Sequence, residues 1–278
     1  MAEKEIKKLR EYFKKRKDVV MAFVFGSFAK GRQMKESDVD VAVYFKSEQE
    51  NFKKEDEIWS DINKIIQNKE VHLVCLNNAP ATLISDVFKT GIPLVIKDKK
   101  LYWELYLYKT LEAEDFVRFA EEYFEIAKKA KSLTSEQKTR LLEKWQFLNN
   151  EMKELKIFEE LSFGDYTENK NKRRNIERWA ENIINVSIDI AKILLASEKK
   201  DMPKTYEEAL LKFGILASLN QQEAEKFSKF ANLRNLLAHE YLDILYKRIQ
   251  VFIKEFPPLY QKIYPFLEKY LKNNKKDL

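Results

Sequence analysis

Two aspartates follow a Gly-Ser pair at a fixed spacing near the start of the 278-residue chain. Ten residues separate Gly26 and Ser27 from Asp38 and Asp40, and an apolar run flanks the motif on each side. The pattern predicts a strand, a turn that contains glycine and a second strand. Because residues i and i+2 of a strand point to the same side, both carboxylates should lie on one face of one strand.

This arrangement suits phosphoryl or nucleotidyl transfer. Carboxylate oxygens are good Mg²⁺ ligands, and Mg²⁺ also takes ligands from substrate phosphates. Two such ions can clamp the attacking and leaving oxygens, while a turn can present backbone N–H groups and a hydroxyl to a triphosphate. We therefore expect Asp38 and Asp40 to be catalytic and to bind the metal. The residues expected to bind the nucleotide are Gly26, Ser27, Lys30, Asp38 and Asp40.

The first 130 or so residues resemble the minimal nucleotidyltransferase (MNT) domain of the polymerase-β-like superfamily. The resemblance is carried by the Gly-Ser and Asp-x-Asp pattern, then KEVHLVCLNNAP, then VFKTGIPLVIKD. It implies Mg²⁺ and ATP as cofactors. This family typically carries a third carboxylate on its next core strand, where this chain has His72. In the family that carboxylate is commonly linked to activating the attacking hydroxyl.

The His72 departure leaves several interpretations open. A neutral imidazole is a poor Mg²⁺ ligand. Glu70 would point to the same side of the strand as His72 and is a possible substitute, although it lies one pleat away. The simplest alternative is that His72 packs beside the cleft. The sequence therefore supports nucleotide and metal binding better than turnover.

The composition favours long helices. Hydrophobic residues make up 45% of the chain and charged residues 35%, with only 5 glycines and 6 prolines. The net charge of +6 permits RNA contact without demonstrating it. The single cysteine, Cys75, excludes an intramolecular disulfide. No apolar stretch approaches the ~18 residues that cross a bilayer, and the charged N-terminal helix is not a secretory signal, so we expect a cytoplasmic protein that does not contact membranes.

Apolar periodicity predicts an α+β chain with a mixed sheet first and helices afterwards. The predicted strands are 19–25, 38–45, 71–76 and 92–96, and the helices between and after them are 4–17, 51–67, 80–89 and 101–131. Further helices are predicted at 136–160, 169–197, 205–213 and 221–238, with a break at 162–165 and a last helix interrupted at Pro257 and Pro258. We expect two domains, 1–132 and 133–278, the second an all-α antiparallel bundle.

A second motif lies in the helical region. Arg234 is followed after four residues by His239, and Tyr241 comes two residues later. With the preceding LSFGDY and RRNIERW segments, the motif resembles HEPN domains of the subgroup that pairs with MNT proteins. An arginine can hold an RNA phosphate, and a histidine can exchange a proton with a 2′-hydroxyl, so together they could cleave RNA without metal.

Helix geometry constrains this motif. Residues five apart lie ~140° around a straight helix, so Arg234 and His239 cannot share one stripe. Either the helix ends near Ala238, or two copies combine their motifs at an interface. The HEPN resemblance implies the second, a homodimer through the helical bundle.

The two resemblances together imply an antitoxin-like and a toxin-like domain on one chain. In separate-chain relatives, the MNT protein is thought to transfer AMP from ATP onto the HEPN tyrosine, here Tyr241, and so to silence RNA cleavage. The implied partners are ATP and an RNA, with tRNA as one candidate. Two alternatives remain: a small-molecule adenylyltransferase of the aminoglycoside type, and a nucleotide-binding scaffold weakened at His72.

Overall fold

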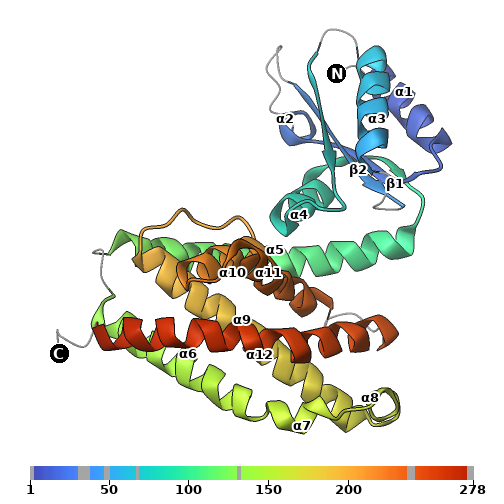
Figure 1. Ribbon diagram of the computed structural model, residues 1–278. Helices are drawn as coiled ribbons and strands as arrows, with labels where there is room; N and C mark the ends of the chain where they lie inside the picture. The colour runs from blue at the N-terminus through green and yellow to red at the C-terminus, as the bar shows by residue number, and fades with distance from the viewer. Residues whose placement is uncertain are drawn as a thin grey trace. The chain divides into compact units, whose positions relative to one another are not determined.

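The structure is a computed structural model that divides into two compact units, Met1–Val117 and Arg118–Leu278 (Figure 1). It describes residues 3–30, 38–46, 51–66, 69–129, 133–236 and 242–273. The first unit holds a small mixed sheet and the second is helical, so the predicted α+β class is confirmed. The expected domain boundary after residue 132 stays a prediction. Across the described ranges, no helix is both long enough and apolar enough to cross a membrane.

A four-stranded sheet in the order β3-β2-β1-β4 forms the centre of the first unit. Its strands are β1 (Val19–Phe25), β2 (Val39–Phe45), β3 (Val71–Cys75) and β4 (Ile92–Ile96). β1 runs antiparallel to β2 and β4, whereas β2 and β3 are parallel. The helices of this part of the chain are α1 (Glu3–Lys15), α2 (Gly26–Ala29), α3 (Asn51–Ile65), α4 (Ala81–Thr90) and α5 (Lys99–Lys128). All four predicted strands agree with the structure to within a residue at each end.

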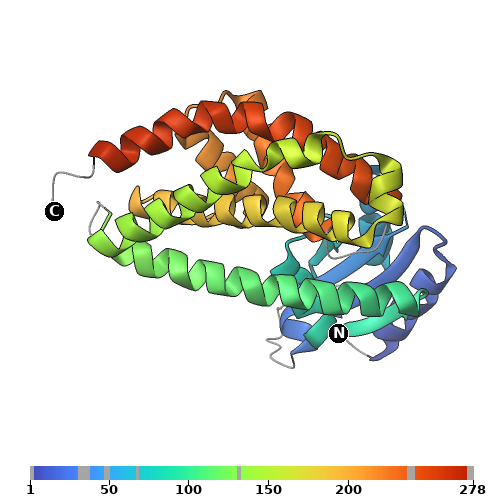
Figure 2. The same ribbon diagram turned by 90° about the horizontal axis from the view of Figure 1, so that it is seen from below.

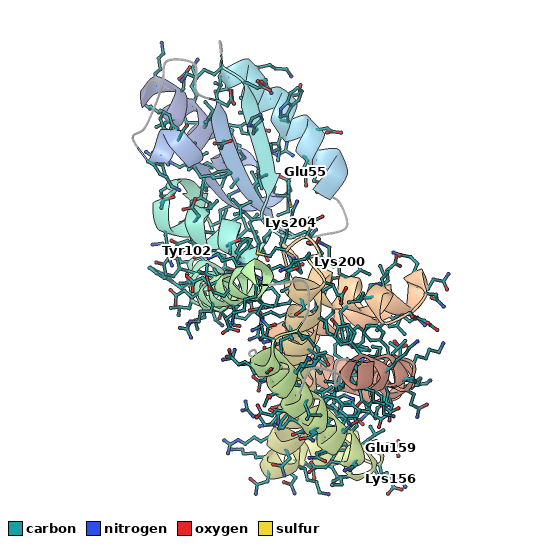
Figure 3. All side chains as sticks on the ribbon, turned by 90° about the vertical axis from the view of Figure 1, so that its left-hand side faces the viewer. Glu55, Tyr102, Lys156, Glu159, Lys200 and Lys204 are labelled. Atoms are coloured by element: carbon teal, nitrogen blue, oxygen red, sulfur yellow. The ribbon has the colours of Figure 1, made fainter. Side chains whose placement is uncertain are left out.

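Helices cover both faces of this sheet. Val41 and its strand neighbours on one face pack with Phe13 of α1 and Ile62 of α3. On the other face, Phe23 packs with Phe88 of α4, whose ring lies 5.2 Å from that of Tyr102. Tyr102 lies on α5 and is labelled in Figure 3. A sheet that is buried on both faces requires apolar residues at nearly every strand position. Polar side chains at the strand ends therefore stand out as candidates for chemistry.

The second unit is built around a long, largely buried helix. Its helices are α6 (Ser135–Lys153), α7 (Leu155–Glu159), α8 (Phe163–Glu168), α9 (Lys170–Ser197), α10 (Tyr206–Leu216), α11 (Gln221–Leu236) and α12 (Leu242–Asn273). α9 contacts α6, α10, α11 and α12, and α6, α9 and α12 lie side by side (Figure 1, Figure 2). From Ile183 onward α9 is buried on almost every side, as expected for the central helix of a bundle.

The predicted break at 162–165 is right at Ser162 and wrong for residues 163–165. Residues 161 and 162 lie outside any helix, and Ser162 caps a new helix, α8, by accepting a hydrogen bond of 3.0 Å from the backbone N–H of Asp165. Serine is favoured at this position because its hydroxyl satisfies a backbone donor that has no partner within the helix. A Ser-Phe-Gly-Asp segment is therefore compatible with a helix start as well as with a turn.

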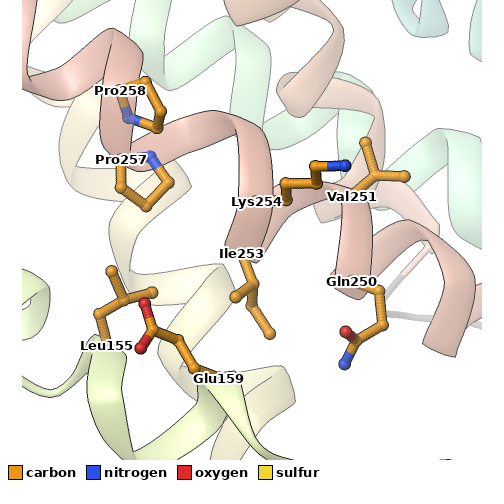
Figure 4. Close-up of a pocket in the computed structure, with 8 residues that line it drawn as sticks. All are labelled: Leu155, Glu159, Gln250, Val251, Ile253, Lys254, Pro257 and Pro258. Carbon is orange, nitrogen blue, oxygen red and sulfur yellow. The ribbon is translucent and has the colours of Figure 1, made fainter.

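The predicted interruption of the last helix at Pro257 and Pro258 is also wrong, because α12 continues through both residues. A proline has no N–H, so the carbonyls four residues earlier, those of Ile253 and Lys254, lose their donors within the helix. These residues line a surface pocket together with Leu155 and Glu159 of α7 (Figure 4). Packing against neighbouring helices thus outweighs the cost of placing a proline in a helix interior, which is about 3 kcal/mol per proline.

We expect Pro258→Ala to raise the free energy of unfolding by about 1–2 kcal/mol. Pro258 is exposed, so the change removes little packing and restores an N–H that can donate to Lys254. Thermal and urea unfolding of the full chain would measure the gain. Pro80→Ala is the matched control, because Pro80 precedes the first residue of α4 and its missing N–H interrupts no helix. A loss of stability in Pro258→Ala would contradict this account of α12.

Candidate functional site

The site begins where β1 ends. Gly26 follows the last residue of β1 and has φ +73°, a backbone conformation that side-chain-bearing residues rarely adopt. A Cβ at this position would lie 2.0 Å from Oδ2 of Asp40. Two requirements therefore coincide at Gly26, a left-handed backbone and an open space that the Asp40 carboxylate fills.

The parallel pairing of β2 and β3 brings the next polar residues together. Asp40 and His72 are direct partners in the register, and the Val39 N–H donates to the Glu70 carbonyl over 2.8 Å. Nδ1 of His72 lies 3.4 Å from Oδ1 of Asp40, and its Nε2 lies 3.6 Å from Oε1 of Glu70. His72 is half exposed, with 51% of its side chain accessible, so it is not a buried packing residue.

Three of these side chains form a potential cation site. Asp38, Glu70 and His72 each offer one ligand atom, and these atoms all lie within 4.8 Å of one another. Asp40 lies beside this group, between Gly26 and His72. The expectation that Asp38 and Asp40 hold a metal stays a prediction. What the structure adds is that Glu70 and His72, both considered from the sequence, lie close to Asp38.

The two remaining residues expected to bind the nucleotide lie in or next to α2. Ser27 is in this short helix, and Lys30 follows it. Nζ of Lys30 lies 2.9 Å from both carboxylate oxygens of Asp86 on α4, a partner that no sequence pattern indicated. Both side chains are more than a third exposed. Exposed ion pairs contribute about 0–1 kcal/mol, so Lys30 can exchange Asp86 for a phosphate at little cost.

Of the motif formed by Arg234, His239 and Tyr241, the structure describes only Arg234. Arg234 lies in the last turn of α11 and is half buried. Its guanidinium carbon lies 4.8 Å from the centre of the Tyr206 ring on α10, close enough for a cation–π contact. His239 and Tyr241 lie outside the described residues. Tyr206 was not foreseen, because nothing in the sequence links the start of α10 to the end of α11.

We expect Gly26→Ala to lower the free energy of unfolding by about 1–3 kcal/mol, the usual cost of a strained backbone conformation. The new methyl would also displace the Asp40 carboxylate. Gly164→Ala is the control, since a Cβ there meets only Ser162 Oγ at 3.8 Å and alanine favours the helix. Unfolding curves of both variants test this. Equal stability of Gly26→Ala and wild type would show that residue 26, directly after β1, does not need the left-handed backbone conformation.

Comparison with known proteins matches both halves of the chain. Residues 7–100 match the family described as "Polymerase beta, Nucleotidyltransferase", and residues 148–266 match "Ribonuclease HepT-like". The "tRNA nuclease HepT" of Aphanizomenon flos-aquae (strain 2012/KM1/D3) is 29% identical over 117 residues, which is 41% of this chain and 80% of that protein.

Two solved structures are also similar. One is described as "Crystal structure of the toxin-antitoxin with AMP-PNP", with a TM-score of 0.34 and 22% identity over 42% of this chain and 96% of the other. The second, a "toxin-antitoxin MntA-HpeT mutant", has a TM-score of 0.34 and 21% identity over 44% and 98%. These structural likenesses are too distant to support an assignment, which depends on the two family matches. The two family matches therefore identify a polymerase-β-type nucleotidyltransferase domain at residues 7–100 and a HepT-like (HEPN) domain at residues 148–266 of one polypeptide.

Proposed function

We propose that the N-terminal domain binds Mg²⁺ and ATP and transfers AMP to Tyr241, and that this modification silences RNA cleavage by the HEPN domain. The observation that carries the first half is the close approach of Gly26 to Asp40. It places the bend after β1 against the carboxylates at the start of β2. A nucleotide bound at the bend would have its phosphates next to those carboxylates.

The residues at this end of the sheet suit the transfer. Gly26, Ser27 and Lys30 would bind the triphosphate, with Asp38 and Asp40 beside its α-phosphate. The carboxylates fit a divalent cation in donor type, because hard cations prefer oxygen ligands. When bound, such a cation neutralises charge that develops on the phosphates. The phenol of Tyr241 would lose its proton to solvent and its oxygen would bond to the α-phosphorus. The bond from the α-phosphorus to the bridging oxygen would break, and pyrophosphate would leave.

The HEPN motif would supply the RNA cleavage that AMP transfer silences. Arg234 carries a permanent planar set of donors suited to an RNA phosphate, and Tyr206 beneath it limits its orientations. His239 would exchange a proton with the 2′-hydroxyl next to the scissile phosphate. AMP on Tyr241, two residues from His239, would place a bulky anion where the RNA phosphate must bind. We place this cleft at a homodimer interface, where two copies combine their motifs.

One observation favours a second candidate, a nucleotide-binding scaffold with little turnover. His72 stands where the resemblance leads us to expect a carboxylate, and Glu70, just before β3, is exposed and lies against His72. Under this interpretation the domain binds ATP without transferring AMP. ATP would then raise the melting temperature while the intact mass of the protein stays unchanged.

We expect incubation with ATP labelled at the α-phosphate and Mg²⁺ or Mn²⁺ to label the protein itself. Tyr241→Phe should abolish the label, and Asp38→Asn should reduce its rate by about 100-fold, the usual effect of losing one charge-stabilising group in an active site. Tyr264→Phe is the matched control, because it removes a hydroxyl from a different tyrosine of the same domain, one that the structure shows to be half-buried. Peptide mass spectrometry would locate the AMP. Label that persists in Tyr241→Phe would exclude this acceptor, and label on an added aminoglycoside would favour the small-molecule alternative.

We expect the unmodified protein to cleave RNA in the presence of EDTA, since neither proposed catalytic group needs a metal. His239→Ala and Arg234→Ala should each slow cleavage by about 100-fold or more. Arg234→Lys separates the two roles of the arginine, because lysine keeps the charge but not the planar fork. Gel assays with a tRNA pool and 2′,3′-cyclic phosphate detection would follow the reaction. Cutting that is unchanged in His239→Ala would exclude the assigned role of His239.

A further inference from the structure

We propose that the cation site of the N-terminal domain selects a transition-metal ion such as Mn²⁺ over Mg²⁺, with His72 as a ligand and Asp40 as the residue that orients it. The inference deepens the proposed function, since it names the ion of the same site, and it rests on that function only for the presence of a divalent cation. It starts from the departure at His72, where the chain places a nitrogen donor among oxygen donors.

The donor atoms are already close to the spacing of one coordination shell. Ligand atoms on opposite sides of one ion lie about 4.0–4.4 Å apart when each bond is about 2.0–2.2 Å. The atoms offered by Asp38, Glu70 and His72 lie within 4.8 Å of one another. Only two of three ligands can lie opposite each other, and neighbouring ligands lie closer together, so side-chain rotations of up to about 1 Å would bring all three onto one ion. Glu70 and His72 are exposed, which leaves room for water or phosphate oxygens to complete the coordination.

The surroundings of His72 supply an independent indication of metal binding. A histidine that binds a metal through one ring nitrogen usually donates the N–H of the other to a carboxylate or a carbonyl. Nε2 of His72 faces Glu70 at 3.6 Å, while Nδ1 faces Oδ1 of Asp40 at 3.4 Å. The geometry thus assigns Nε2 to the ion and Nδ1–H to Asp40. The second oxygen of Asp40 lies against Gly26, which limits how far the carboxylate can turn.

The ion preference follows from the ligand types. Mg²⁺ is hard, binds through oxygen and loses its water reluctantly, so an imidazole contributes little to its affinity. Mn²⁺ accepts carboxylate oxygen and also binds imidazole, and later first-row ions bind imidazole more strongly. An Asp–Glu–His set is therefore expected to discriminate against Mg²⁺ more strongly than an all-carboxylate set at the same position.

We expect the full chain, free of nucleotide, to bind Mn²⁺ at least about 10-fold more tightly than Mg²⁺. The loss of the free Mn²⁺ signal in electron paramagnetic resonance measures binding, and Mg²⁺ is then titrated as a competitor. His72→Asp should reduce the ratio of the two affinities toward that of an oxygen-only site. His239→Gln, which removes the only other imidazole of the chain, should leave the ratio unchanged. An equal ratio in wild type and His72→Asp, or equal affinities for both ions in wild type, would overturn the proposal.

Variants of Asp40 test its positioning role separately from direct coordination. Asn keeps an oxygen that can accept the Nδ1–H of His72, whereas Ala keeps none. We expect Asp40→Ala to weaken Mn²⁺ binding by about 10–100-fold, as is usual when the partner of a metal-binding histidine is lost. Asp40→Asn should recover most of that affinity. Asn and Ala variants that are equally weak would show that Asp40 binds the ion directly.

These results are distinguishable from a failure of the proposed function. The metal measurements need neither ATP nor Tyr241, so the ion preference can hold in a protein that transfers no AMP. Conversely, transfer that is equally efficient with Mg²⁺ and Mn²⁺, together with equal affinities for both ions, would retain the adenylyltransferase and reject the ion preference.

Discussion

The absence of one side-chain atom at Gly26 determines the geometry of the N-terminal site. The chain turns through a left-handed conformation directly after a fully buried strand, and the space where a Cβ would lie holds a carboxylate oxygen of Asp40. Without that close approach, the bend after β1 and the acidic start of β2 would be separated by the width of a side chain. The rest of the first unit supports this point, because helices on both faces of the sheet fix the strands that meet there.

The sequence predicted the parts of this site that depend on strand parity. The placement of Asp38 and Asp40 on one face follows from alternation along one strand. The strand boundaries agree with the structure because buried strands read as continuous apolar runs. The distances could not be predicted, since they depend on register. That Asp40 faces His72, or that Lys30 meets Asp86 from α4, is decided by how the strands and helices pair across the fold.

In the helical unit, the positions of the helices could be predicted better than their interruptions. Helix periodicity located most of its helices, but the local signals for helix ends misled where tertiary packing opposed them. Pro257 and Pro258 lie within a continuous helix because the flanking residues Phe256 and Leu259 are buried in the bundle. The contact between Arg234 and Tyr206 was equally inaccessible, since the two residues lie 28 positions apart and belong to different helices. Their contact follows only from the way α10 and α11 pack in the folded protein.

Under the proposed function, the chemistry of the acceptor accounts for a histidine at position 72. A third carboxylate in such a site would help to remove the proton of an attacking hydroxyl. An aliphatic hydroxyl needs that help because it holds its proton tightly, whereas a phenol, with a pKa of about 10, releases it far more readily. A domain without the third carboxylate is thus better matched to a tyrosine than to the hydroxyl of a sugar or an aminoglycoside. In the proposed function the phenol lowers the demand on a base, and the imidazole of His72 stays available as a ligand for the cation.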